Sequence, residues 1–423
     1  MPGNRAGDGN VTVEAKIKPD DLRAAALAFD LRALPAGFVD DPFPLFRALR
    51  EHDPVHRMPD GSLFLTRHAD LETVYKDTAT FSSDKKLEFG AKYGPSPLFD
   101  HHTTSLVFND PPLHTRVRKI IAGALNPRAV SALEPDVEGL VGRLLDTMAE
   151  RREVDLIEEF ASAIPVEVIG NLLAVPHEER EPLRDWSLAI LGALEPVLTA
   201  EQTVRGNKAV ADFLVYLETL VARRRAAPGD PDKDMLTRLI QGEANGDRLS
   251  EKELLQNCIF ILNAGHETTT NLIGNALWLF DRWPDQRARL IAEPSLARLA
   301  VEEVLRVESS NQLGNRLTTA PTSIGGVAIA AGTPVTLCIG AANRDPAMFP
   351  DPERFDIGRQ PNRHLGYASG PHQCVGMSVA RLEGRIAVSR FLQRFPDYRI
   401  IGTPVRSGRV RFRGFMSLRA VLR

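Results

Sequence analysis

The sequence predicts a mainly α-helical fold with small β-sheets, and three observations lead to this expectation. Apolar residues recur at helical spacing along residues 128–150, 205–226 and 286–308. Short runs in which apolar and polar residues alternate, as in strands, occupy residues 62–66, 323–337 and 409–422. These strand-like runs do not alternate regularly with the helical segments, which argues against a doubly wound parallel sheet.

The composition is that of an ordinary soluble globular protein, with 43% hydrophobic and 25% charged residues among 423. The 52 Lys and Arg residues and 55 Asp and Glu residues give a net charge of −3, which does not support nucleic-acid binding. The length alone is compatible with two or three domains. Residues 1–20 are polar, and we expect a disordered N-terminal tail there.

Cysteine content and hydropathy bear on the location of the protein. Three cysteines, an odd number, are too few for a disulfide framework and favour a reducing, cytoplasmic setting. The first residues lack the apolar core of a signal peptide. No run of about 18 uncharged apolar residues occurs, so no membrane span is expected. We also expect a monomer, because no long exposed apolar seam is apparent.

The longest predicted helix begins at Ser250 and stops before Pro284. Ser250 is a favourable capping residue, and Glu253 three residues later completes the pattern of a capping box. At 1.5 Å per residue, this segment would form a rod about 50 Å long. Its middle is apolar on all sides, so we expect the helix to cross the core.

Polar residues at 266–270 interrupt the apolar middle of this helix, and two interpretations remain open. The polar groups could be satisfied by neighbouring carbonyls within an ordinary core. Alternatively, this turn faces a ligand. The Thr268 hydroxyl would then bond back to the Ala264 carbonyl and bend the helix. Gly265 would let a large flat group approach, and Glu267 beside Thr268 would form an acid–alcohol pair suited to a proton relay.

Cys374 lies in an irregular segment, unlike Cys258 and Cys338, which sit in apolar runs and are expected to be small buried hydrophobic residues. Gly370 and Gly376 free the backbone on either side of Cys374. A helix is predicted directly after Gly376. Such a loop can aim N–H groups and a helix N-terminus at one sulfur, which favours a thiolate that binds a metal.

Three chemistries would use such a thiolate. Zinc would need further Cys or His ligands at the usual spacing, and the sequence does not provide them. A nucleophilic cysteine would need a histidine base, for which His372 is a candidate. A single thiolate ligand to haem iron fits a lone cysteine better than either of these.

The segment GYASGPHQCVG resembles the haem-binding loop of the cytochrome P450 monooxygenases, Phe-Gly-x-Gly-x-His-x-Cys-x-Gly. The matching positions are held by Gly370, His372, Cys374 and Gly376. Tyr367 stands where Phe is usual, so its hydroxyl would need a partner close to the sulfur. Ala368 stands where Gly is usual, so it would need a backbone angle acceptable to a Cβ atom. Both departures would affect the redox potential of haem iron rather than remove its ligand.

Two further segments resemble family motifs. Residues 264–268, AGHET, resemble the oxygen-binding helix motif, which includes the acid–alcohol pair. Glu303 and Arg306 resemble the Glu-x-x-Arg pair, with a spacing that puts both side chains on one helix face. An ordinary surface ion pair is the alternative. The resemblance implies a buried structural pair, completed by Arg354.

The resemblance also implies which residues bind the haem propionates. Residues 114–118, HTRVR, resemble the segment whose His114 and Arg118 clamp a propionate. Arg316 and His372 fall where the family places further propionate contacts, and His364 is an additional candidate. Bidentate bonding between guanidinium and carboxylate groups is the physical reason for arginine at such positions.

Taken together, the resemblance implies one large cytochrome P450 domain at residues 21–423 that binds haem b through Cys374. It implies a monooxygenase that uses O₂ to hydroxylate or O-dealkylate a small hydrophobic substrate. Thr268 would steady oxygen and a water, while Glu267 passed protons from solvent. Electrons would come from a ferredoxin and its NAD(P)H-dependent reductase. Basic residues expected to attract this acidic partner are Arg116, Lys119, Arg363 and Arg381.

Other haem functions remain open from the sequence. A haem-thiolate peroxygenase or isomerase would need no electron partner, and the intact Glu267–Thr268 pair argues against it. A non-catalytic haem sensor is a further alternative, against which a proton relay in the pocket also argues. Turnover with hydrogen peroxide or with a ferredoxin system would distinguish these classes.

The substrate pocket is expected, by analogy with the family, from residues 84–106, 187–202, the helix near Asn263 and residues 309–315. The turn at Phe415 and Met416 would complete it. Polar candidates for substrate contact are His101, His102, Asn263, Asn311 and Gln312. One or two of the last three are expected to orient a compact hydrophobic substrate by hydrogen bonds.

Overall fold

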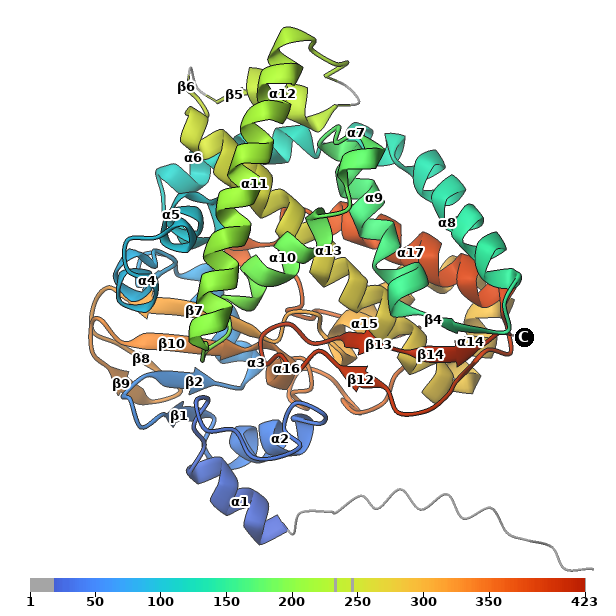
Figure 1. The fold of residues 1–423 in the computed structure, drawn as a ribbon. Coiled ribbons are helices and arrows are strands. Elements are labelled where there is room, and N and C mark those ends of the chain that lie inside the picture. The colour runs from blue at the N-terminus through green and yellow to red at the C-terminus, as the bar shows by residue number, and fades with distance from the viewer. Residues whose placement is uncertain (1–18, 232–233, 245–246, 423) are drawn as a thin grey trace, which may run out of the picture.

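The computed structural model describes residues 19–231, 234–244 and 247–422, and this part of the chain is mainly helical (Figure 1). The predicted tail at 1–20 lies outside the described residues except for its last two, with which the first helix begins. The helices are α1 (Pro19–Leu27), α2 (Phe43–His52), α3 (His68–Lys76), α4 (Lys86–Tyr93), α5 (Pro97–Thr104), α6 (Leu113–Ala124), α7 (Pro127–Ala132), α8 (Glu134–Ala149), α9 (Ala163–Leu172), α10 (Leu183–Gly192), α11 (Ala200–Ala226), α12 (Met235–Gln241), α13 (Glu251–Arg282), α14 (Pro284–Ala292), α15 (Ala297–Val307), α16 (Ile339–Ala342) and α17 (Met377–Arg394).

The three segments with helical periodicity are helical, but two of them are divided. Residues 128–150 form α7 and α8, with a proline in the first turn of α8. Residues 286–308 form α14 and α15, which are separated by a 3-10 turn at Pro294–Leu296. In both places a proline begins a helical segment, because its missing N–H does no harm in the first turn but would break a helix interior.

The strands are short and form small sheets, as the alternating runs predict. They are β1 (Val55–Arg57), β2 (Leu63–Leu65), β3 (Phe81–Ser82), β4 (Glu153–Asp155), β5 (Glu243–Ala244), β6 (Asp247–Arg248), β7 (Leu313–Thr318), β8 (Thr322–Ile324), β9 (Val327–Ile329), β10 (Pro334–Cys338), β11 (Arg399–Ile400), β12 (Val405–Arg406), β13 (Phe415–Ser417) and β14 (Arg419–Val421).

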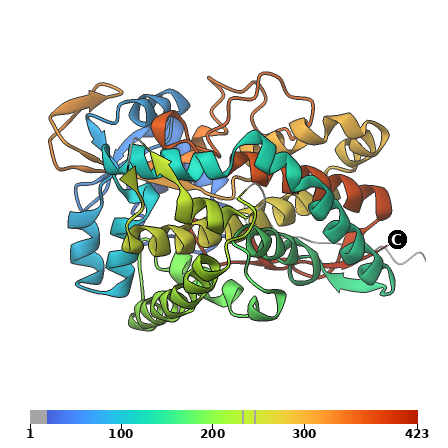
Figure 2. The same ribbon diagram turned by 90° about the horizontal axis from the view of Figure 1, so that it is seen from above.

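The largest sheet has the strand order β1-β2-β10-β7-β3. Strand β10 pairs in parallel with β2 and antiparallel with β7. The sequence analysis did not predict β7, which places Arg316 opposite Val335. In both views this sheet lies at one end of the molecule and the long helices lie at the other (Figures 1 and 2).

Helix α13 crosses the middle of the molecule, as its apolar sequence predicts (Figure 1). The Ser250 hydroxyl accepts the Glu253 N–H, and the Glu253 carboxylate accepts the Ser250 N–H, so the predicted capping box is confirmed. With 32 residues, α13 is about 48 Å long. It packs against α9, α10, α11, α15 and α17. The apolar cluster around it takes members from Phe89 to Leu422, so most of the chain contributes to one core.

Helix α17 approaches α13 from a distant part of the chain, and the irregular segment that contains Cys374 lies directly before it. Among the described residues, no helix combines the length and the apolar character that crossing a membrane requires.

Candidate active site

The loop before α17 presents Cys374 to a cavity. The Cys374 N–H donates to the Tyr367 carbonyl at 2.9 Å, which folds the chain back on itself ahead of the helix. Gly376 caps α17, so the sulfur lies close to a helix N-terminus, as predicted. Burial raises the pKa of the Cys374 thiol, and the Gly376 N–H and the Arg118 guanidinium act in the opposite direction. Cys374 lies inside the protein but is accessible through the cavity that it borders, whereas Cys258 and Cys338 are buried, as expected.

Two small residues shape this loop. Gly370 has a φ of 67°, and a Cβ atom there would lie 2.4 Å from the Tyr75 carbonyl oxygen, so only glycine fits. Ala368 also adopts the left-handed region, with a φ of 56°. The expectation that Ala368 would have an angle acceptable to a Cβ atom is therefore wrong. This alanine is strained, because the left-handed conformation costs a residue with a Cβ atom about 1–2 kcal/mol. Glycine, which the family usually has here, adopts this conformation without that cost.

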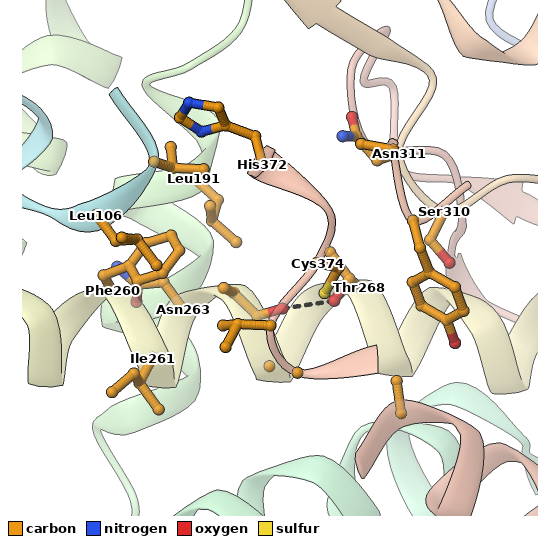
Figure 3. Close-up of a pocket in the computed structure, with 18 of the residues that line it drawn as sticks. Leu106, Leu191, Phe260, Ile261, Asn263, Thr268, Ser310, Asn311, His372 and Cys374 are labelled. Carbon is orange, nitrogen blue, oxygen red and sulfur yellow. Dashed lines mark hydrogen bonds between the residues drawn. The ribbon is translucent and has the colours of Figure 1, made fainter. Parts of the chain in front are cut away.

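The cavity has a volume of about 320 Å³. Cys374 borders it from the loop and Thr268 borders it from α13, and both point into it (Figure 3). The rest of the wall comes mainly from α5, the segment between α5 and α6, α10, β7 and residues 411–412. Most of these side chains are apolar, among them Leu106, Leu191 and Phe260.

Four basic residues predicted to bind propionates line one rim of the cavity: His114, Arg118, Arg316 and His372. The rings of His114 and His372 stack with their centroids 3.8 Å apart. Burial lowers their pKa values to about 4 and about 2, so both rings are neutral at physiological pH. Among the described residues, neither Nε2 atom nor the Arg316 Nε has a hydrogen-bond partner. This rim therefore retains unused polar groups where a ligand's carboxylates would find them.

His364, the additional propionate candidate, does not border the cavity. Its Nε2 atom lies 3.1 Å from the Glu302 carboxylate, and its Nδ1 accepts the Gly366 N–H. Glu302 also binds Arg381, so His364 belongs to a polar cluster beside the loop rather than to the rim.

The predicted bond in the middle of α13 is present. The Thr268 hydroxyl donates to the Ala264 carbonyl at 2.5 Å, and both residues border the cavity. Gly265 borders it as well, but a Cβ atom there would lie 1.9 Å from Ile169 Cδ1 of α9. The close approach of α9 therefore requires glycine at this position. The absence of a side chain also leaves room for a ligand in the cavity.

Glu267 faces away from the cavity despite its position next to Thr268, because successive helical residues point about 100° apart. Both carboxylate oxygens accept from Arg409 at 2.5 Å. Burial raises the pKa of Glu267 to about 7, and Arg409 acts to lower it. Glu267 lines a second, much smaller cavity of about 20 Å³ with His266. The sequence analysis missed Arg409, which no spacing rule connects with Glu267.

The predicted Glu303–Arg306 pair is fully buried and bidentate, with bonds of 2.8 and 2.9 Å. The prediction that the Arg354 side chain completes this pair is wrong. Arg354 contributes only its backbone carbonyl, to which Arg306 donates. The guanidinium that reaches Glu303 belongs to Arg359, at 3.1 Å. Asn362 also donates to this carboxylate. Because Arg354 is exposed, its side chain has no role at the buried pair.

Four of the seven residues predicted for the substrate pocket border the cavity: His101, His102, Asn263 and Asn311. Gln312 is buried outside it and donates to the Ser309 carbonyl. Phe415 and Met416 line the second cavity instead, so placing them in the substrate pocket is wrong. The C-terminal chain reaches the main cavity earlier, at Arg411 and Phe412, where Asn311 and Phe412 form a β-bridge.

A thiol and an alcohol thus border one cavity, and a rim of unused basic groups lies at its edge. This suits a flat, doubly anionic porphyrin whose iron is bound by one cysteine. A Cβ atom at Gly376 would meet no described atom within 4 Å, which leaves space beside the sulfur. The fold and the site define a haem-thiolate protein.

Comparisons with known proteins identify the family. The family model named Cytochrome P450 matches residues 195–396. The chain is 38% identical over 389 residues to Cytochrome P450 107B1 of Saccharopolyspora erythraea, which covers 89% of this chain and 93% of the relative. It is 35% identical to the epothilone C/D epoxidase of Sorangium cellulosum, over 94% of this chain and 96% of that one. The chain therefore belongs to the cytochrome P450 family.

Solved structures agree with this assignment. The structure of P450BioI in complex with a hexadec-9Z-enoic acid ligated acyl carrier protein has a TM-score of 0.87 and 32% sequence identity. It covers 92% of this chain, and all of that chain is matched. The protein is accordingly a bacterial-type cytochrome P450 monooxygenase with haem b, a cysteine thiolate ligand and O₂ as co-substrate.

The residues at this site would have separate roles in catalysis. Haem with a thiolate ligand, when bound, activates O₂ and favours cleavage of its O–O bond. Cys374 would supply that thiolate, and the basic rim would hold the propionates. Thr268 places a hydroxyl on the opposite wall, where it can hold a water and pass on a proton. The apolar wall excludes other water and receives the substrate.

Proposed function

We propose that the protein hydroxylates or O-dealkylates a small hydrophobic molecule, with electrons delivered by a ferredoxin and its NAD(P)H-dependent reductase. The observation that carries this proposal is the mainly apolar chamber that Cys374 and Thr268 share. An apolar wall favours apolar substrates, and the alcohol next to the oxygen site supports proton-coupled use of O₂. We place this reaction in the cytoplasm and assign it to a monomer.

The side of the haem that carries the thiolate is the natural entry point for electrons. Arg118 lies near the Cys374 sulfur and donates to the Gln373 carbonyl. Two of the four basic residues expected to attract a ferredoxin are ion-paired, Arg381 with Glu302 and Arg116 with Glu253. Their attraction for an acidic partner is therefore reduced. We base the electrostatic part of the proposal on the other two expected residues, Lys119 and Arg363, which are exposed.

Turnover of 7-ethoxycoumarin, a neutral aromatic ether, tests the proposal. We expect dealkylated product only when ferredoxin, reductase, NAD(P)H and O₂ are all present, and we expect ¹⁸O₂ label in the acetaldehyde released. Product formed with hydrogen peroxide alone, but not with the ferredoxin system, would instead show a peroxygenase.

A further inference from the structure

Apart from the basic rim, six side chains of the cavity wall carry buried polar atoms without a hydrogen-bond partner among the described residues. They are Ser83, Tyr367, Glu383, His102, Asn263 and Ser310. His102, Asn263 and Ser310 are 2%, 2% and 4% exposed. The His102 Nε2, both amide atoms of Asn263 and the Ser310 hydroxyl have no hydrogen-bond partner within the part of the chain that the structure describes. All three residues border the cavity. Burying such groups unpaired destabilises a fold, so their presence calls for a ligand that satisfies them.

Each of these residues has a counterpart of the same type nearby that is fully engaged. On α13, Asn257 donates to the Glu253 carbonyl at 2.8 Å and accepts the Leu106 N–H at 3.0 Å. Ser309, next to Ser310, donates to the Leu305 carbonyl. Neither Asn257 nor Ser309 borders the cavity. Asn257 and Ser309 thus show that side chains of these types find protein partners close by when they do not border the cavity. Unpaired polar atoms also occur on α13 outside this cavity, at His266, Asn271 and Asn275, so the contrast concerns these two pairs alone.

His102 and its neighbour His101 both border the cavity from α5, but they differ in their bonding. The neighbouring His101 bonds to Gln256 of α13 at 2.8 Å, whereas the His102 Nε2 has no bond among the described residues. The bond from His101 also fixes α5 against the N-terminal half of α13. Leu106, which follows α5 in the chain, lies on the Asn263 side of the cavity in Figure 3. We therefore place His102 at the same end of the cavity as Asn263.

The unpaired groups lie at two ends of the chamber. Asn263 and Ser310 appear on opposite sides of Cys374 and Thr268, with Leu106 and Phe260 on the Asn263 side (Figure 3). Asn263 precedes Thr268 by five residues, which is about 7.5 Å along the helix axis. The oxygen site thus lies between two polar ends that are separated by apolar walls.

The polar groups offered at both ends are neutral. Burial lowers the pKa of His102 well below its usual value, so this ring carries no charge at neutral pH. Arg411 also borders the cavity, but its guanidinium donates to the Leu194 and Leu313 carbonyls and to the Asn315 side chain. Burial lowers the pKa of Arg411, and the nearby Glu195 carboxylate acts in the opposite direction. An anionic substrate would compete with these established contacts.

We infer that the substrate is an uncharged, elongated molecule with a hydrogen-bonding oxygen at each end. Asn263 and His102 bind one end, Ser310 binds the other, and the carbon that is oxidised lies between them. This inference rests on the proposed function, because it names the substrate class of the same chamber. A carboxylic acid that pairs with Arg411 is the competing outcome.

Thermal unfolding of the haem-loaded protein without substrate tests whether the polar groups serve a ligand or the fold. Asn263→Leu removes an amide without partners, so the unfolding midpoint should stay unchanged or rise. The matched Asn257→Leu removes two hydrogen bonds and should lower the midpoint. Likewise, Ser310→Ala should leave the midpoint unchanged or raise it, whereas Ser309→Ala, which removes the bond to the Leu305 carbonyl, should lower it. If Asn263→Leu lowers the midpoint as much as Asn257→Leu does, the inference is overturned.

Spin-state titrations with two steroids of one skeleton test the substrate class. Androst-4-ene-3,17-dione is neutral with a ketone at each end, and 3-oxoandrost-4-ene-17β-carboxylic acid replaces one ketone by a carboxylate. We expect the diketone to bind at least about tenfold more tightly than the acid, because burying an unpaired carboxylate is costly. Asn263→Leu and Ser310→Ala should each weaken diketone binding about five- to tenfold, while Ser309→Ala should not.

Tighter binding of the acid, no shift with the diketone, or unchanged diketone affinity in both cavity variants would overturn the inference. The spectrum of the reduced protein with carbon monoxide, together with 7-ethoxycoumarin turnover, is measured on the same samples. Failure of those two measurements would count against the proposed function, and success there with failed steroid titrations would count against the inference alone.

Discussion

Arg409 binds both carboxylate oxygens of Glu267 at 2.5 Å, across 142 residues of sequence. This ion pair holds the acid of the acid–alcohol motif on the side of α13 that faces away from the main cavity. Two opposing effects, burial and the Arg409 guanidinium, set the charge of this carboxylate. We propose that Glu267 passes protons towards Thr268, and proton delivery would then depend on that charge.

Arg409→Gln should shift the pH dependence of catalysis. Burial would then act without opposition, and the pKa of Glu267 would rise above its value of about 7. A higher pKa moves the ionisation of Glu267 to higher pH, so product formed per NAD(P)H consumed should fall at neutral pH and recover as the pH rises. Arg419→Gln is the matched control, because Arg419 pairs with Glu153 at the surface. An unchanged pH profile for Arg409→Gln would contradict this account of the pair.

Replacing Arg359 by leucine should lower the free energy of unfolding much more than replacing Arg354 by leucine. Arg359→Leu removes a charged partner from the buried Glu303 and should lower the free energy of unfolding by about 1–3 kcal/mol. Arg354→Leu keeps the carbonyl that Arg306 uses and changes only an exposed side chain, so its effect should stay within about 0.5 kcal/mol. Denaturant unfolding measures both, and equal losses would contradict the assignment of Arg359.

Ala368→Gly should stabilise the protein by about 0.5–1 kcal/mol. The φ of 56° at Ala368 is unfavourable for a residue with a Cβ atom, and this gain exceeds the extra chain entropy that glycine brings to the unfolded state. The same change at Ala211, on the exposed side of α11, should destabilise by about 1 kcal/mol. A loss of stability in Ala368→Gly would show that the left-handed conformation is not strained.

The buried carboxyl group of Glu383 should make the stability of the folded protein depend on pH. Burial raises its pKa from 4.5 to about 8. A pKa raised in the folded state means that the stabilising contribution is complete below pH 4.5 and is lost as the pH rises to about 8. Glu383→Gln should flatten this decline, so that its unfolding midpoint exceeds that of the original protein most clearly above about pH 8. The exposed Glu293→Gln serves as the control, and parallel pH curves for both variants would refute the prediction.

Local spacing was enough to predict part of this structure. The capping box at Ser250 and Glu253, the back-bond from Thr268 to Ala264 and the Glu303–Arg306 pair each join residues within four positions of one another. Bonds of this kind depend on helix geometry alone, and a sequence shows that geometry directly.

The errors concern residues whose partners are distant in the chain. Arg354 and Arg359 are equally plausible partners for Glu303 in sequence, and only the fold of the segment between them decides which side chain turns inward. Arg409 reaches Glu267 because the C-terminal chain folds back over α13. Phe415 was misplaced because the chain meets the cavity three residues earlier, at Phe412.

The ligand role of Cys374 is tested most directly by the absorption spectrum of the reduced protein with carbon monoxide. The original protein and Cys258→Ser, which alters a buried cysteine, should both show the strongly red-shifted Soret band of haem bound through sulfur. Cys374→Ser should lose that band, even where it still retains haem. A Cys374→Ser protein that kept the shifted band, or an original protein that never showed it, would contradict the assignment of this thiolate to the iron.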